Sequence, residues 1–131
     1  MIVITAALNN ARLAGIVGFL DAGTSPAQIQ LYGGTRPATP LLAPGTPLLA
    51  AINLAKPSGT IQNDELVLVP ASTDAMVQSS GIAAWARMVA GDGTVGFDCD
   101  AGEGLGPWAV QLAQVQLFAG GAVRLLRAVL V

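Results

Sequence analysis

The chain has 131 residues, of which 53% are hydrophobic and only 11% are charged, and its formal net charge is −2. This length suits one domain with its own core, and the low charge offers no basic surface for binding nucleic acid. Histidine is absent, so the chain lacks the commonest general base and the commonest metal ligand. We therefore expect residues 1–131 to form a single non-catalytic domain without a cofactor.

The first twenty residues are apolar enough to raise the question of a signal peptide or a membrane span. Asn9, Asn10 and Arg12 interrupt this apolar run, and no positively charged stretch precedes it. We therefore expect a soluble intracellular product that has no membrane partner.

A helix is predicted for residues 5–21. Thr5 is a suitable N-cap, and Gly23 can adopt the left-handed conformation that ends a helix. Four apolar side chains share one helix face: Leu13, Ile16, Val17 and Leu20. This face should pack against a sheet or a partner subunit, because an isolated helix of this length is marginal in water.

After Pro26, short β-type runs alternate with glycine and proline. Residues 27–32 should form a strand, whereas 35–47 contain four prolines and should form an extended arm or surface loop. Together with strand 27–32, residues 48–131 should build the β core. Within it we expect a turn at 56–59 and strands at 48–54, 65–69, 75–77, 82–90, 94–99, 108–118 and 122–131.

The strand spacing predicts a mainly β fold, namely an antiparallel β-sandwich or small barrel (jelly-roll or Ig-like) with one N-terminal α-helix. Asp92-Gly93 is the strongest hairpin signal in the chain. In the strand before it, Trp85, Arg87 and Val89 should share one face. Trp85 and Trp108 are expected to anchor the packing.

No group of residues makes a convincing reactive site. The carboxylates in residues 98–103 are too incomplete for a calcium loop, because Ala109 occupies the position of its last bidentate acid. Serine nucleophiles would need Lys56 as their base, and Lys56 should be solvated in a turn. Cys99 has no disulfide partner and should be a half-buried strand residue, while the glycines of 102–106 should permit a tight connection. We therefore expect no metal site and no catalytic residue.

Several segments carry a family resemblance: LDAG at 20–23, IQLYGGTRP at 29–37, PLLA at 47–50, GIAAWAR at 81–87 and GDG at 91–93. With these segments, most of the chain resembles small structural proteins encoded among the virion genes of tailed bacteriophages and prophages. The resemblance implies a multicopy virion part that assembles in the host cytoplasm, either a capsid decoration (cement) protein or a neck or tail component. It transfers no catalytic residue.

The expected partners are therefore further copies of the chain, the major capsid protein or other virion proteins. The surplus of apolar residues over what one small core can bury should mark their interfaces. Arg36, at the start of the arm, and Arg124 and Arg127, on opposite faces of the last strand, are the candidate interface residues, with solvated surface arginines as the alternative. A carbohydrate-binding or adhesin-like module is the alternative from another functional class.

Overall fold

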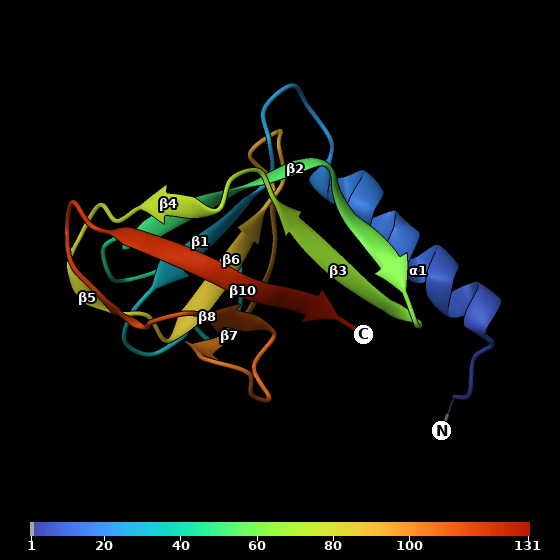
Figure 1. Cartoon of the computed structure of the whole chain (residues 1–131). Helices are drawn as coiled ribbons and strands as arrows, with labels where there is room; N and C mark the ends of the chain where they lie inside the picture. Colours follow the sequence, from blue (N-terminus) through green and yellow to red (C-terminus); the bar gives the residue numbers. More distant parts are fainter. Residues whose placement is uncertain (1) are drawn as a thin grey trace.

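In the computed structural model, which describes residues 2–131, one helix precedes ten strands (Figure 1). The elements are α1 (Ala6–Leu20), β1 (Gln28–Tyr32), β2 (Ala50–Gln62), β3 (Glu65–Pro70), β4 (Asp74–Met76), β5 (Gly81–Ile82), β6 (Trp85–Val89), β7 (Val95–Glu103), β8 (Val110–Leu112), β9 (Gln116–Leu117) and β10 (Ala122–Leu130). Among the described residues, no helix combines the length and apolar character needed to cross a membrane.

Seven strands close into a barrel in the order β3-β2-β1-β6-β7-β8-β10, because β10 pairs again with β3. β4 extends the sheet beyond β10, and β5 pairs with β9 in a separate two-stranded sheet. The mainly β fold and the small barrel are thus confirmed, whereas a jelly-roll or Ig-like sandwich is not.

One pair of strands departs from the expected antiparallel arrangement. β7 and β8 run parallel, with Ala101 opposite Val110 and Glu103 opposite Leu112. Parallel neighbours usually need a long crossover. Here the paired part covers only three residues, so the short connection 104–109 can return the chain to the start of the pairing.

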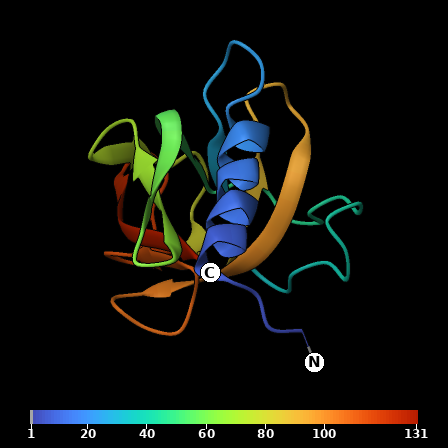
Figure 2. The same ribbon diagram turned by 90° about the vertical axis from the view of Figure 1, so that its right-hand side faces the viewer.

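The predicted helix face is confirmed. Leu13 and Leu20 are fully buried in the core, and Ile16 and Val17 pack against it. α1 lies against β2 and β3, beside the open end of the barrel (Figures 1 and 2). The helix therefore covers core residues that the strands alone would leave in water.

Both ends of α1 are capped by side chains. The Thr5 hydroxyl accepts a hydrogen bond from the Leu8 amide (3.1 Å). At the other end, Lys56 Nζ donates to the carbonyls of Asp21 (3.2 Å) and Gly23 (2.8 Å). The predicted turn at 56–59 was wrong, because β2 continues through these residues, with a shift of register between Leu54 and Gly59. Lys56 itself is exposed, as predicted.

Two other predicted strands are each divided. Within 82–90, the backbone changes partner between Ala83, whose amide bonds the Val115 carbonyl, and Ala84, whose amide bonds the Tyr32 carbonyl. The run therefore splits into β5 and β6. In the same way 108–118 splits into β8 and β9. The Val115 carbonyl accepts a hydrogen bond from Ala83, next to β5, and the residues after it pair with β5 and not with a strand of the barrel.

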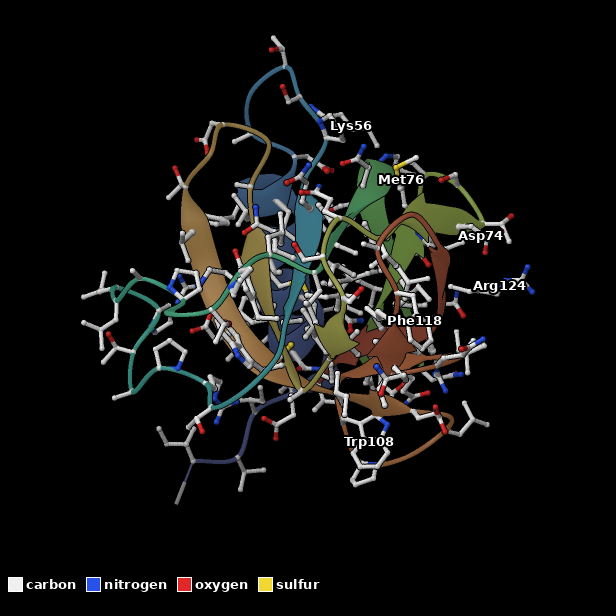
Figure 3. All side chains as sticks on the ribbon, turned by 90° about the vertical axis from the view of Figure 1, so that its left-hand side faces the viewer. Lys56, Asp74, Met76, Trp108, Phe118 and Arg124 are labelled. Carbon is white, nitrogen blue, oxygen red and sulfur yellow. The ribbon has the colours of Figure 1, made fainter. Side chains whose placement is uncertain are left out.

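The proline-rich arm, residues 35–47, contains no helix or strand, as predicted. It lies outside β7 in both side views (Figures 2 and 3). Arg36 Nη1 meets the Asp100 carboxylate at 3.0 Å, and the Thr46 hydroxyl donates to the Gly33 carbonyl at 3.2 Å. Thus the arm has contacts with its own barrel near both of its ends.

Candidate functional site

The three predicted interface arginines each pair with a carboxylate of the same chain. Arg36 bonds Asp100, Arg124 Nε bonds Asp74 at 3.2 Å, and Arg127 Nη2 bonds Glu65 at 3.3 Å. Arg124 lies on β10, on the other side of the barrel from the arm that carries Arg36 (Figure 3). The structure therefore brings the three arginines to no common site, and exposed pairs of this kind contribute little to stability.

Arg124 and Arg127 lie on the same outer surface, which differs from the prediction that a strand would separate them. The pairing of β10 with β8 shifts between Leu125 and Arg127. Because this bulge adds a residue to one strand, Leu125 and Ala128 both face inward and both arginines face outward.

A buried ion pair lies on the outer face of β6 and β7. Arg87 Nε and Nη2 bond the two carboxylate oxygens of Asp98 at 2.7 and 3.0 Å, and both side chains are at least 95% buried. The Arg87 guanidinium also lies 5.4 Å from the ring centroid of Trp85, which stacks on Tyr32. These four side chains form one block, hereafter the Arg87 block.

Electrostatics in the Arg87 block favour the charged guanidinium. The hydrogen bonds that Arg87 donates to Asp98 raise the pKa of Arg87 despite its burial. Burial raises the pKa of Tyr32, while the nearby Arg87 charge opposes this effect. The Trp85 indole donates to the Gly33 carbonyl (3.1 Å). Because Trp85 and Tyr32 are only 1% and 6% exposed, neither aromatic ring is free to stack on a ligand.

A ladder of amide side chains continues along the same outer face. Tyr32 donates to Gln30, Gln30 to Gln28, and Gln28 to Asn53, at 3.0 to 3.2 Å. The amides line a groove of about 520 Å³ whose other wall is the β6–β7 turn, from Val89 to Gly93. The groove can offer hydrogen bonds to a polar ligand, but it presents no exposed aromatic face.

Three exposed apolar side chains lie on β4, on β5 and directly after β9. Met76, Ile82 and Phe118 are 73%, 57% and 64% exposed. Backbone bonds between Val77 and the 120–121 turn hold the β4 end beside the segment that carries Phe118. Met76 and Phe118 appear on one face (Figure 3). We call these three residues the end patch.

The remaining sequence candidates show no catalytic geometry. Within residues 2–131, no three side chains of the metal-binding types come together. Lys56 Nζ is committed to two carbonyls and cannot serve a serine as base in this arrangement. Cys99 is half-buried, as predicted, and its burial raises the pKa of the thiol to about 12, so the reactive thiolate is disfavoured.

No protein-family model, curated protein or solved structure matches the chain. Function must therefore be inferred from the surface of the barrel. Sequence reasoning missed the Arg87 block, although counting outward from the Asp92-Gly93 turn places Arg87 near Asp98 across the hairpin. It also missed the end patch, because its three residues are far apart in sequence.

Proposed function

We propose that the chain is a non-catalytic structural protein of a tailed-phage virion, which acts through protein–protein contacts. A capsid decoration (cement) role is the preferred form of this proposal. The observation that carries it is the end patch, together with other large apolar side chains that the fold leaves in water, such as Leu41 and Leu126. Exposed apolar clusters of this kind mark interaction sites in soluble proteins.

The paired arginines fit the same proposal. Arg36, Arg124 and Arg127 each pair with a carboxylate on the exposed surface, and exposed charged residues are typical of the rim of an interface. The resemblance of the sequence to virion structural proteins supplies the biological setting. A neck or tail adaptor of the same virion is the alternative within this class.

Co-sedimentation tests the proposal. The purified chain is mixed with phage heads, and separately with necked and tailed particles, that lack it. Binding to heads supports decoration, and binding only to necked or tailed particles supports the adaptor. Met76→Lys/Phe118→Glu should reduce binding at least about 30-fold, because it puts charge into two apolar contacts. Leu105→Lys is the matched control on an exposed loop, and a chain that binds no particle contradicts the proposal.

A carbohydrate-binding module is the second candidate, and the amide-lined groove beside Gln28 and Gln30 is the observation that favours it. Sugar sites usually add an exposed aromatic platform. Here Tyr32 and Trp85 are covered. A glycan array probed with the wild type and with Gln30→Ala decides between the two, since saturable glycan binding that Gln30→Ala abolishes would favour the module.

A further inference from the structure

The wall of the barrel is incomplete beside the first part of β7. β8 has three residues, whereas its neighbours β7 and β10 have nine each. β8 pairs only with Ala101–Glu103 of β7, so residues 95–100 have a paired strand on the β6 side alone. Within residues 2–131, no strand lies along the opposite edge of this segment.

The backbone at this edge is directed toward the gap. The Ala101 amide donates to the Ala84 carbonyl at 3.1 Å, which fixes the alternation of bonds between β6 and β7. By that alternation Phe97 and Cys99 bond to β6, and the amide and carbonyl of Asp98 point away from it. The described chain gives these two groups no hydrogen-bond partner, so the edge can accept an added strand.

The floor beside the edge is apolar. One hollow of about 320 Å³ lies between Phe19 of α1 and Gly96 of β7, and a second of about 330 Å³ reaches Val129–Val131. Both hollows are lined by Ile16 and Phe97, so they lie next to each other beside α1. We call the two hollows together the α1–β7 groove.

A matching segment lies before α1 in the same chain. Ile2, Val3 and Ile4 are 89%, 83% and 42% exposed, and all three are β-branched residues that favour strands. In a strand, Ile2 and Ile4 would point to one side, as a groove floor requires. Both views show this segment running away from the body of the protein (Figures 1 and 2).

The segment cannot readily enter the groove of its own copy. Thr5 caps α1 in an extended conformation, and the groove runs along the helix from Arg12 to Phe19. Three residues span only about 10 Å when extended. To reach its own groove, the chain would have to reverse direction at Thr5 and break the cap.

We propose that the segment Ile2–Ile4 of one copy adds as a strand to the α1–β7 groove of a second copy, and that two copies exchange segments reciprocally. Such an exchange satisfies the free edge of β7 and buries the exposed aliphatic side chains in one step. Reciprocal exchange closes a two-fold dimer. This inference rests on the proposed function only in assuming self-association, and it names the contact.

Complementation between two variants tests the exchange. Ile2→Asp/Ile4→Asp removes the donor and keeps the groove, whereas Phe19→Asp/Val131→Asp removes the groove and keeps the donor. Every changed side chain is exposed, and circular dichroism checks that both variants fold. Sedimentation velocity should show a wild-type dimer whose dissociation constant rises at least about 100-fold in each variant. Mixing the two variants should restore a heterodimer through one intact contact.

Peptide binding and cross-linking give independent readouts. A synthetic peptide with the sequence of residues 2–8 should bind the donor variant and should not bind the groove variant. In a Cys99→Ala background, chains with Val3→Cys should form disulfides with chains that carry Val131→Cys. They should not do so with chains that carry Leu105→Cys, an equally exposed control elsewhere on the surface.

Three outcomes would overturn the inference: a wild type that stays monomeric at high concentration, dimers that both variants retain, or a peptide that binds both variants equally. The proposed function fails separately. A segment-exchanged dimer that binds no particle sinks the virion role and leaves this contact standing. A chain that binds particles through Met76 and Phe118 and yet stays monomeric supports the virion role and sinks this contact.

Discussion

The two edges of β7 differ in their hydrogen-bond partners. Toward β6, residues 95–100 are paired along their length, and Asp98 bonds Arg87 inside the Arg87 block. Toward β10, the backbone of residues 95–100 has no neighbouring strand, and an apolar groove lies beside it. The chain thus supplies its own polar partners on one side of β7 and leaves the other side open to an added strand.

The largest loss of stability should come from breaking the Arg87–Asp98 pair, on the β6 side of β7. Asp98→Ala leaves the Arg87 charge buried without its partner, which should cost about 3–5 kcal/mol of unfolding free energy. Urea denaturation followed by fluorescence measures it. The double variant Arg87→Met/Asp98→Leu should be less destabilised than Asp98→Ala, because it removes both charges. Equal losses would show that packing, and not the stranded charge, dominates.

Gly102, where β7 meets β8, should give the next effect. A Cβ at this position would lie 2.3 Å from the Trp108 ring, so Gly102→Ala must displace the indole and should cost about 1–3 kcal/mol. Near-UV circular dichroism and denaturation report the change. Gly15→Ala is the matched control, since nothing lies within 4 Å of the new methyl group on α1, and it should stabilise by about 0.5–1 kcal/mol.

Alkaline pH should lower the unfolding free energy through Cys99, on the inner face of β7. The pKa of Cys99 is raised from 9.0 to about 12, so between these values the unfolded chain loses a proton that the folded chain keeps. Stability should therefore fall as the pH rises above 9. The loss between pH 7 and pH 10.5, measured by urea denaturation, should be smaller by about 2 kcal/mol in Cys99→Ala. The raised pKa of Tyr32 acts in the same direction, so Cys99→Ala should still lose some stability at alkaline pH.

The smallest effect should come from Arg36→Ala. Its partner Asp100 is on the same outer face as Asp98, yet both members of the pair are exposed. The substitution should therefore change the unfolding free energy by less than about 1 kcal/mol, and added salt should shrink the difference. A loss near that of Asp98→Ala would mean that the arm is part of the core structure.

Local patterns predicted what local chemistry determines. The spacing of Leu13 and Leu20 located the buried face of α1, and Asp92-Gly93 located the β6–β7 hairpin. The arm could be recognised because its prolines exclude regular hydrogen bonding. Half-burial of Cys99 followed from its place in a strand.

Features that depend on distant partners could not be predicted in this way. The closure of the barrel joins Leu66 to Leu130, and nothing near either residue specifies the other. The bulge that turns Arg127 outward depends on how β8 meets β10. Lys56 looked like a turn residue, because only the folded chain brings the carbonyls of Asp21 and Gly23 to its ammonium group.

The position of β10 in the barrel has a consequence for synthesis on the ribosome. β10 pairs with β3, β4 and β8, and it is the last of these strands to be translated. Until it emerges, β3 and β8 each lack one neighbour, and the nascent chain presents unpaired edges and open core residues to other chains. We therefore expect truncation before residue 122 to yield an aggregating fragment, and a ribosome-bound chain to complete its barrel only after β10 has left the exit tunnel.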